Sequence, residues 1–317
     1  MKIFSGSSNK KLTKQICQFL DEPFGNVYLH AFPSGERYCQ YKENIRGQDT
    51  FIIQSLDTPV NDNLMELLIM IDAAKRASAS RITAVIPYMG YLRQDRKTKS
   101  RTPISGRLVA DMIEAAGANR IISMDFHCAQ AQGFFKIPVD HLYATPVITE
   151  YLNKTNNINV VVSPDVGGVK RAHAYAETLD VSFAFIAKKR ISDTEVESSE
   201  VCGDVKDKNV LLVDDMTESA GTLISAADIC KEAGASTVTC AITHGVFTTK
   251  AQERFESAGH VIDEFIYTNT THNKTINLQN SRVGKMTELN VGNLLGRAIK
   301  RTHTNESISE LFQVEGF

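Results

Sequence analysis

Short apolar runs alternate with longer amphipathic segments along most of the chain. The runs are rich in Val, Ile and Phe, and they include KIFSG, NVYLHAF, TFIIQS, RITAVIPY, RIISMDF, NVVVSP, VSFAFI, NVLLVDD, STVTCAITH and VIDEFIY. Such runs are typical of buried strands. Residues 61–77 and 223–235 place apolar side chains at helical spacing. The alternation predicts an α/β fold with mainly parallel central sheets that helices cover on both faces.

The second half of the chain repeats the pattern of the first. A strand, a turn of small residues and a helix are expected at residues 3–20 and again at 161–179. A second pair, residues 77–88 and 233–244, follows in the same order, and aligned serines give offsets of 158 and 156 residues. Chance likeness between α/β elements would explain one match, but two matches in one order favour an internal duplication.

A length of 317 residues also favours two domains over one. We expect an N-terminal domain at residues 1–143 and a C-terminal domain at residues 144–317. The tail from about residue 301 is a candidate to pack back on the N-terminal domain. No Pro-, Gly- or Ser-rich linker lies near the boundary, so we expect the halves to be packed together rather than tethered.

Composition narrows the class of protein. The formal net charge of −2 argues against a general nucleic-acid binder. The start MKIFSGSSNKK has no apolar stretch of signal-peptide length, and no run in the chain is long enough to span a bilayer. The six cysteines are scattered without CxxC spacing, which indicates reduced thiols. We therefore expect a cytoplasmic protein that binds neither nucleic acid nor membranes.

The stretch LLVDDMTESAGT, residues 211–222, joins an expected strand to an expected helix. Ligands of parallel α/β sheets bind at the carboxyl ends of the strands, where a turn can direct backbone N–H groups at an anion. Ser219 and Thr222 add hydroxyl donors, and Gly221 lets the backbone approach a ligand closely. These features predict a site for a phosphate monoester, although a capped helix start is the alternative for such a turn. No GxxxxGK[ST] motif is present, so the turn is not a P-loop.

The same stretch also carries three acidic residues, Asp214, Asp215 and Glu218. Their carboxylates would repel a phosphate that they faced, but they suit the hydroxyl groups of a sugar or a hydrated Mg²⁺ ion. Acid for a diol and hydroxyl groups for a phosphate together predict a phosphorylated pentose as the ligand.

A second candidate site is a basic loop that follows the expected strand RITAVIPY. Five basic residues lie within nine positions, namely Arg93, Arg96, Lys97, Lys99 and Arg101. A solvated loop or a nucleic-acid patch is the common alternative for such a run. Its position at the ligand-binding end of a strand favours a polyphosphate.

Two further segments carry candidate residues whose structural alternatives stay open. His127 in MDFHCAQ ends an expected strand, where a lone histidine is usually a hydrogen-bonded structural group. FIAKKRISDTE places Lys188, Lys189 and Arg190 at a strand end, where a solvated hairpin tip is the alternative.

These motifs together resemble one known family. VLLVDDMTESAGT resembles the phosphoribosyl-pyrophosphate loop of the type I phosphoribosyltransferase fold, and the whole chain is similar to the ribose-phosphate pyrophosphokinases. The resemblance is carried by KIFSGSS, NDNLMELLIMIDAAKRASASRITAVIPY, RQDRKTKSRTPIS, MDFHCAQAQGFF, PVDHLYATP, VVSPDVGG, GDVKDKNVLLVDD, ITHGVF and RTHTNESISELF.

The resemblance implies a transferase of nucleotide biosynthesis. Such an enzyme moves the pyrophosphoryl group of ATP to the C1 hydroxyl of ribose 5-phosphate, which gives phosphoribosyl pyrophosphate and AMP. Family members require Mg²⁺, contain two duplicated phosphoribosyltransferase-like (Rossmann-like) domains, and form homo-oligomers that are commonly hexamers. A non-catalytic homologue that associates with an active synthetase is the alternative.

The resemblance also implies a role for particular residues. The ATP-binding residues are Arg93 and Gln94, together with Phe32 and Glu36 of FPSGE, which resembles a segment that reaches into the ATP site of a neighbouring subunit. The residues that bind ribose 5-phosphate are Asp214, Asp215, Glu218, Ser219, Ala220, Gly221 and Thr222. The pyrophosphate loop contains Asp165, Gly167 and Gly168, the Mg²⁺ positions are His127 and Asp165, and the catalytic cations are Lys188 and Arg190. Candidate allosteric phosphate residues are Arg46, Ser307 and Ser309.

The chain departs from the family pattern at a few positions. Ser34 and Thr98 replace residues that are usually acidic or amide, and Glu218-Ser219 replaces the more common Asp-Thr. Asn44 stands where a serine is usual near the allosteric position. We favour an active enzyme over the non-catalytic homologue, because the chain keeps the residues on which catalysis and binding would most depend, namely Asp214, Asp215, Asp165, His127, Lys188, Arg190 and Arg93. A phosphoribosyltransferase that consumes the product fits poorly, since such enzymes lack the duplicated half and the basic loop.

Overall fold

The computed structural model describes residues 1–155, 157–190, 197–258, 260–272 and 281–311. For residues 188–190 and 197–198 it describes the backbone without the side chains. The chain divides into two compact units. The first contains Met1–Tyr143, Thr270–His272 and the described chain from Asn290 onward, and the second contains Ala144–Asn269 together with strand β14.

The first unit is built on a five-stranded sheet in which all neighbouring strands are parallel, in the order β1-β4-β5-β6-β7. These strands are β1 (Lys2–Ser5), β4 (Asp49–Ile53), β5 (Arg81–Ile86), β6 (Arg120–Met124) and β7 (Val139–Leu142). A separate antiparallel hairpin is formed by β2 (Val27–Ala31) and β3 (Arg37–Tyr41).

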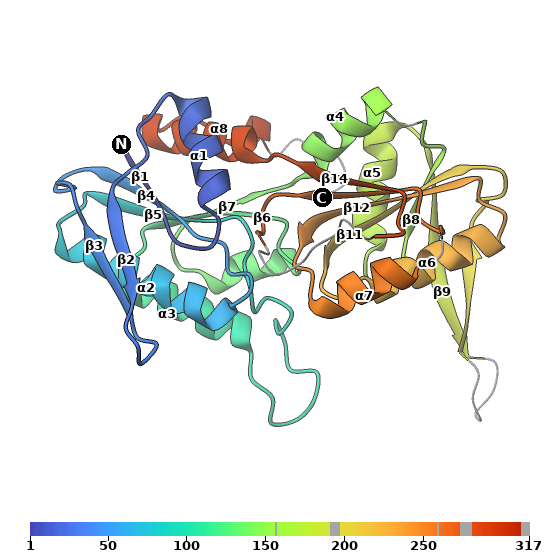
Figure 1. Cartoon of the computed structure of the whole chain (residues 1–317), viewed down its shortest axis with the longest axis horizontal. Coiled ribbons are helices and arrows are strands. Elements are labelled where there is room, and N and C mark those ends of the chain that lie inside the picture. Colours follow the sequence, from blue (N-terminus) through green and yellow to red (C-terminus); the bar gives the residue numbers. More distant parts are fainter. Residues whose placement is uncertain (156, 191–196, 259, 273–280, 312–317) are drawn as a thin grey trace. The chain divides into compact units, whose positions relative to one another are not determined.

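Helices cover both faces of this sheet. Helices α1 and α8 lie on one face, and α2 and α3 lie on the other (Figure 1). The helices are α1 (Lys10–Leu20), α2 (Val60–Arg76), α3 (Ser105–Ala116) and α8 (Gly292–Thr304), with short 3₁₀ helices η1 (Ala129–Phe134) and η2 (Ser309–Leu311). Phe51 and Ile52 are consecutive in β4 and both are 0% exposed, so both faces of the sheet are covered.

The second unit has a seven-stranded sheet in the order β10-β9-β8-β11-β12-β13-β14, in which only β10 is antiparallel to its neighbour among the described strands. The strands are β8 (Val160–Ser163), β9 (Ser182–Arg190), β10 (Glu197–Cys202), β11 (Asn209–Thr217), β12 (Thr237–Gly245), β13 (Glu264–Thr268) and β14 (Lys285–Leu289). Helices α4 (Thr145–Thr155) and α5 (Val169–Leu179) lie on one face, and α6 (Gly221–Glu232) and α7 (Thr249–Ser257) on the other (Figure 1).

The two units repeat one topology. The order β8-β11-β12-β13-β14 in the second unit matches β1-β4-β5-β6-β7 in the first, strand by strand along the chain. A hairpin follows the first helix in both, β2–β3 after α1 and β9–β10 after α5. The hairpin stands alone in the first unit, whereas in the second unit β9 pairs with β8 and joins the sheet. The expected duplicated α/β fold with mainly parallel sheets is therefore confirmed.

Helix α8 belongs to the first unit although it comes from the end of the chain. We expected a tail from about residue 301 to return, but the returning segment begins at Asn290. A Cβ atom at Gly296 would lie 2.5 Å from the ring of Phe19, and one at Gly292 would lie 3.1 Å from Gln15 Cβ. The two glycines, four residues apart on α8, thus let that helix approach α1 closely.

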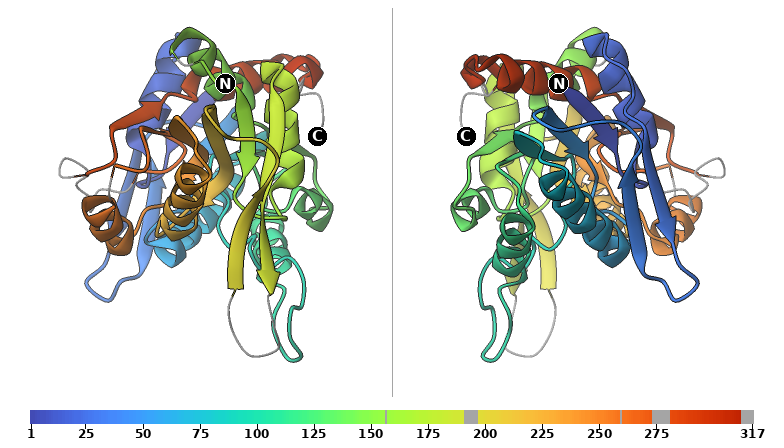
Figure 2. Two further views of the ribbon diagram at one scale, coloured as in Figure 1. Left: turned by 90° about the vertical axis from the view of Figure 1, so that its right-hand side faces the viewer. Right: turned by 90° about the vertical axis from the view of Figure 1, so that its left-hand side faces the viewer.

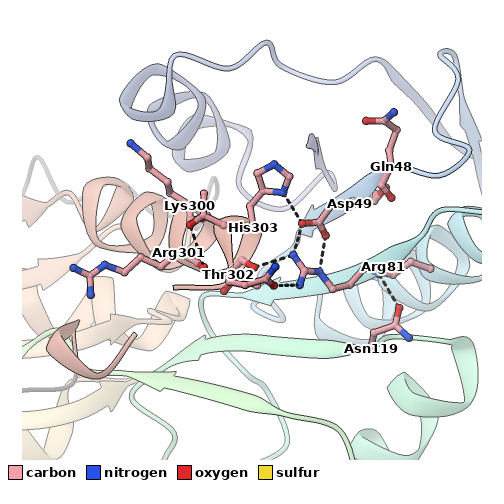
Figure 3. A network of polar contacts seen from close by, with 12 residues as sticks. Gln48, Asp49, Arg81, Asn119, Lys300, Arg301, Thr302 and His303 are labelled. Atoms are coloured by element: carbon pink, nitrogen blue, oxygen red, sulfur yellow. Dashed lines mark hydrogen bonds and ion pairs between the residues drawn. The ribbon is translucent and has the colours of Figure 1, made fainter. Parts of the chain in front are cut away.

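A polar network fixes the end of α8 to the first residues of two interior strands, β4 and β5 (Figure 3). Both carboxylate oxygens of Asp49 accept from Arg81, with 2.8 Å between Arg81 Nε and Asp49 Oδ1. Nδ1 of His303 lies 2.7 Å from Asp49 Oδ2, and Arg81 Nη2 donates to Thr302 O at 2.8 Å. The strands β4 and β5 are therefore tied to the last turn of α8.

No helix in the described residues is long and apolar enough to cross a membrane.

Candidate active site

The turn between β11 and α6 presents backbone N–H groups. Ala220 has a left-handed conformation with φ of 56°, and its N–H donates to Thr217 Oγ1 at 3.0 Å. The first internal bond of α6 runs from Ile224 N to Ala220 O at 3.0 Å. The N–H groups of residues 221–223 therefore have no carbonyl partner within the helix, as is general for a first helical turn. Such groups, with the helix dipole behind them, favour an anion.

The carbonyl groups of the same turn are held by the segment that follows β12. Thr217 O accepts from the N–H groups of Val246 and Phe247 at 3.1 and 3.3 Å. Glu218 O accepts from Thr248 N at 2.7 Å and from Thr248 Oγ1 at 2.9 Å. Because these acceptors are already bonded, they are turned away from an anion that binds the N–H groups.

Two adjacent aspartates at the end of β11 share one cation. Arg171 Nη1 lies 3.1 Å from Asp214 Oδ1 and 3.2 Å from Asp215 Oδ1. Asp215 is 3% exposed. Burial and the neighbouring Asp215 carboxylate raise the pKa of Asp214 from 3.8 to about 7, because one guanidinium offsets only part of two negative charges. The pair therefore forms a partly neutralised acidic site directly before the phosphate-type turn.

The turn SPDVGG connects β8 to α5, next to the first turn in the sheet because β8 pairs with β11. Asp165 Oδ1 accepts from Gly168 N at 2.9 Å, and Ser163 Oγ donates to Asp165 O at 2.6 Å. A Cβ atom at Gly168 would lie 2.8 Å from Ser163 Oγ, and one at Gly167 would lie 3.2 Å from Asp165 Oδ1. The compact turn therefore requires small residues, and its exposed outer side is open to an anion.

The second unit thus brings together most of the residues predicted for ribose 5-phosphate and pyrophosphate. Asp165 to Gly168 lies at the carboxyl end of β8, and Asp214 to Thr222 lies at the carboxyl end of β11. Lys188 and Arg190 are in β9. This strand pairs with β8 on the side opposite to β11. The side chains of Lys188 and Arg190 lie outside the described residues, and their catalytic roles stay predictions.

The residues predicted for ATP lie in two projecting segments of the first unit. The β2–β3 hairpin and the loop after β5 both extend on the side of α2 and α3 (Figures 1 and 2). Phe32 at the hairpin tip is 45% exposed, and its N–H donates to Glu36 O at 2.9 Å. In the loop, Arg93 and Gln94 are exposed, and Gln94 Oε1 accepts from Ser105 Oγ at 2.5 Å. Their contacts with a nucleotide stay predictions.

The two predicted metal ligands belong to different units, His127 to the first and Asp165 to the second. His127, after β6, and Asp165 are both exposed. Among the residues that the structure describes, no group of three or more His, Cys, Asp or Glu side chains is arranged to hold a metal ion. Mg²⁺ usually keeps several waters and takes one or two carboxylates together with substrate phosphates. An exposed carboxylate beside a pyrophosphate-type turn fits that mode of binding, and His127 is the less usual ligand for this hard cation.

The predicted allosteric residues lie at two places on the first unit. Ser307 and Ser309 follow α8, and their hydroxyl oxygens are 3.0 Å apart. Ser309 lines a groove of about 350 Å³ that three arginines, Arg81, Arg120 and Arg301, also line. Arg46 is exposed near the start of β4, and no hydrogen bond or ion pair joins it to either serine within the described chain.

Sequence analysis missed two arginines that contact the candidate site. Arg171 lies six residues after Asp165, in the first turn of α5, so its position beside a recognised turn was an available signal. Arg254 in α7 donates from Nη1 to the hydroxyl oxygen of Ser219 at 2.7 Å and to its carbonyl oxygen at 3.1 Å. No motif marked Arg254, because α7 is brought to the turn by the fold alone.

Comparisons with known proteins agree with this arrangement. A family model described as the N-terminal domain of ribose phosphate pyrophosphokinase matches residues 1–117, and a phosphoribosyl synthetase-associated domain matches residues 194–313. A ribose-phosphate pyrophosphokinase of Synechococcus elongatus is 46% identical over 99% of this chain and 94% of its own length. One of Thermotoga maritima is also 46% identical, over 99% of this chain and 98% of its own length.

Solved structures agree with the sequence comparison. The crystal structure of phosphoribosylpyrophosphate synthetase from Mycobacterium smegmatis matches with a TM-score of 0.88 and 41% identity, over 96% of this chain and 99% of that chain. The likeness extends through both units and is far above the level at which only a fold is shared. The chain belongs to the ribose-phosphate pyrophosphokinase family.

Proposed function

We propose that the chain transfers the pyrophosphoryl group of ATP to the C1 hydroxyl of ribose 5-phosphate, giving phosphoribosyl pyrophosphate and AMP. The observation that carries this proposal is the pairing of two turns at the carboxyl ends of adjacent strands. One turn combines the acidic pair Asp214 and Asp215 with free N–H groups of a helix start, and the other, at Asp165, suits a pyrophosphate. Acidic groups for a sugar beside two anion sites match this substrate and product.

The turn before α6 is proposed to hold the sugar phosphate. The 5-phosphate would accept hydrogen bonds from the N–H groups and hydroxyls of residues 219–222, where the helix dipole favours negative charge. Asp214, Asp215 and Glu218 would accept from the ribose hydroxyls. Glu218 is one methylene longer than the usual aspartate, so we expect weakened sugar binding rather than its loss.

ATP is proposed to bind the projecting segments of the first unit. Arg93 would pair with phosphate oxygens, because a guanidinium presents paired donors to a phosphate, and Gln94 would add a neutral contact. Phe32 and Glu36 lie together in the β2–β3 hairpin, and this hairpin would reach into the ATP site of a neighbouring copy, where the exposed ring of Phe32 would contact the nucleotide. Ser34 and Thr98 are the positions at which nucleotide contacts would differ from those of relatives.

We propose Mg²⁺ as the cofactor, held by Asp165 and by the phosphates of ATP, and the role of His127 as a further ligand stays a prediction. Mg²⁺ supplies charge neutralisation for the phosphate oxygens. The protein's own cations act where charge develops. As the C1 oxygen bonds to the β-phosphorus, the bond from that phosphorus to the oxygen shared with the α-phosphorus breaks. AMP leaves with that oxygen, and the proton of the C1 hydroxyl is released. Lys188 and Arg190 would stabilise the negative charge on the transferred group and on AMP.

The assembly, regulation and compartment are also proposals. The exposed aromatic side chains Tyr28, Phe32 and Tyr38 of the β2–β3 hairpin favour contact with a second copy, consistent with a homo-oligomer, for which we propose a hexamer. Phosphate would act at Ser307 and Ser309.

All six cysteines are free thiols, which supports the reducing cytoplasm as the compartment.

The test of this proposal is AMP release from ATP with and without ribose 5-phosphate, in Mg²⁺ and phosphate buffer. We expect AMP in amounts equal to the phosphoribosyl pyrophosphate formed, and none that depends on sugar without Mg²⁺. Lys188→Ala should lower the rate about 100-fold or more, because it removes one cation that stabilises the transition state. Lys189→Ala, the adjacent residue with the same charge, is the matched control.

The absence of sugar-dependent AMP from a folded preparation that binds ATP would refute the proposal. The non-catalytic regulatory homologue would then be the better account, and the search would turn to a catalytic partner chain. Equal rates for Lys188→Ala and the unchanged chain would remove the catalytic assignment of Lys188.

A further inference from the structure

Arg254 lies against the turn that we assign to the sugar phosphate. Its Nη1 is 2.7 Å from Ser219 Oγ and 3.1 Å from Ser219 O. A Cβ atom at Gly221 would lie 2.2 Å from the same nitrogen, so the guanidinium covers the backbone at Gly221. Any side chain at Gly221 would push the guanidinium off the turn, which gives this glycine a specific role.

This contact completes the ordering of the turn. The carbonyl oxygens of Thr217 and Glu218 are held by the segment after β12, and Arg254 holds that of Ser219. Three consecutive carbonyl groups are therefore bonded on one side of the turn. The N–H groups at the start of α6 then face an incoming anion without competing acceptors from the turn itself.

The guanidinium also adds positive charge at this place. No carboxylate pairs with Arg254 in the part of the chain that the structure describes. Arg254 is exposed and lines an open groove of about 390 Å³ together with Gly221 and Asp228, and no ion pair joins Arg254 to Asp228. A cation without a compensating carboxylate raises the positive potential at the helix start, where the 5-phosphate is proposed to bind.

We propose that Arg254 is a positioning residue that makes the site selective for a phosphorylated sugar. It acts through Ser219, whose carbonyl group it turns outward and whose hydroxyl group it fixes. The inference rests on the proposed function, because it concerns the same phosphate turn. It assigns part of the ribose 5-phosphate affinity to a helix that contributes no residue to the recognised motif.

The test compares Arg254→Gln, Arg254→Lys and the unchanged enzyme by steady-state kinetics and by calorimetric titration with ribose 5-phosphate. We expect Arg254→Gln to raise both KM and Kd for ribose 5-phosphate by about 10- to 100-fold, the usual range for a charge-assisted contact. The KM for ATP and kcat should stay within about twofold. Arg254→Lys should recover part of the affinity because it restores the charge without the paired donors.

Lys250→Gln is the matched control, since Lys250 is an exposed residue of the same helix and the charge change is identical. It should leave every constant unchanged. Unchanged ribose 5-phosphate affinity in Arg254→Gln would overturn the inference, and so would an equal loss for both substrates, which indicates a general structural defect. If Arg254→Gln does not fold, Arg254→Lys decides, since the inference requires its KM for the sugar phosphate to rise alone.

The two failures are distinguishable. If the unchanged chain makes no AMP with ribose 5-phosphate, the proposed function fails. If it is active and the Arg254 variants bind the sugar phosphate normally, only the positioning role fails.

Discussion

Asp214 and Asp215 are adjacent carboxylates that repel each other in the folded protein. Two carboxylates share the single guanidinium of Arg171, and Asp215 is buried. The raised pKa of Asp214 means that the folded protein binds that proton more tightly than the unfolded chain does. The free energy of unfolding therefore falls as pH rises from about 4 to about 7 and Asp214 ionises. This loss of stability follows from placing an acidic group at the proposed sugar site.

We predict that Asp214→Asn raises the free energy of unfolding of the unliganded protein at pH 7 by about 1 to 3 kcal/mol, because it removes repulsion from Asp215. The gain should shrink as pH falls and vanish below about pH 4, where the aspartate is protonated in both states. Urea unfolding across this pH range measures it. The same variant should lose most of its ribose 5-phosphate affinity.

Asp228→Asn, at an exposed position of α6, is the control and should change stability by less than about 0.5 kcal/mol at any pH. A destabilised Asp214→Asn protein at pH 7 would contradict the account, since the Arg171 pair would then outweigh the repulsion between the aspartates.

Residue types and spacing predicted some of this site and not the rest. Gly167 and Gly168 could be assigned from sequence because the atoms that a Cβ would meet there belong to the same turn, whereas those at Gly221 belong to Arg254. The shared bonds of Arg171 could not, because they depend on how the first turn of α5 meets the end of β11. The contact of Arg254 likewise depends on the fold, because it brings α7 back to Ser219, 35 residues earlier in the chain.

At the scale of elements, the end of α8 depends on Asp49. Burial by itself would raise the pKa of Asp49, but hydrogen bonds from Arg81 and His303 outweigh it and lower that pKa. A lowered folded-state pKa stabilises the fold above about pH 4, the region of the unfolded value, and the contribution is lost as pH falls through the folded value. The attachment of α8 should therefore weaken in acid.

We predict that Asp49→Asn lowers the free energy of unfolding at pH 7 by about 1 to 3 kcal/mol, because a partly buried guanidinium loses its charged partner. Hydrogen exchange should rise most in Gly292–Thr304. The difference from the unchanged protein should begin to shrink near pH 4 and should disappear once the pH falls below the lowered folded-state pKa of Asp49. Asp72→Asn breaks an exposed pair with Arg76 and should cost less than about 0.5 kcal/mol.

Exchange in α8 that stays equal in Asp49→Asn and the unchanged protein would show that apolar packing against α1 alone holds the helix. The close packing of α8 on α1 at Gly292 and Gly296 would then hold α8 on the first unit.

The elements that sequence reasoning found are those with a strong apolar signal. Runs such as NVLLVDD and RITAVIPY became β11 and β5 because buried parallel strands need apolar side chains on both faces. The strands that it did not find are β3 (RYCQY), β7 (VDHL), β10 (ESSEVC) and β14 (KMTEL). β3, β10 and β14 lie in a hairpin or at a sheet edge, where one side stays polar and the periodic signal is weak. β7 also ends its sheet and has only four residues.

At the scale of the whole molecule, one topology occurs twice with different turns. The first unit has SGSSN at the end of β1 and SLDTP after β4. The second has SPDVGG at the end of β8 and, at the place that corresponds to the end of β4, DDMTESAGT, which begins in the last residues of β11. The duplication was visible in sequence because the strands and small-residue turns are local patterns. The return of α8 to the first unit was less visible, since it depends on contacts between the two ends of the chain.

The central claim is that β- and γ-phosphates leave ATP together and become attached to the sugar. The most direct measurement incubates the protein and Mg²⁺ with ribose 5-phosphate and ATP labelled at the β-phosphorus, and then separates the products. The account predicts label in a sugar diphosphate attached at C1, with unlabelled AMP as the only nucleotide product. Label retained in ADP, or released as pyrophosphate without a sugar product, would contradict it.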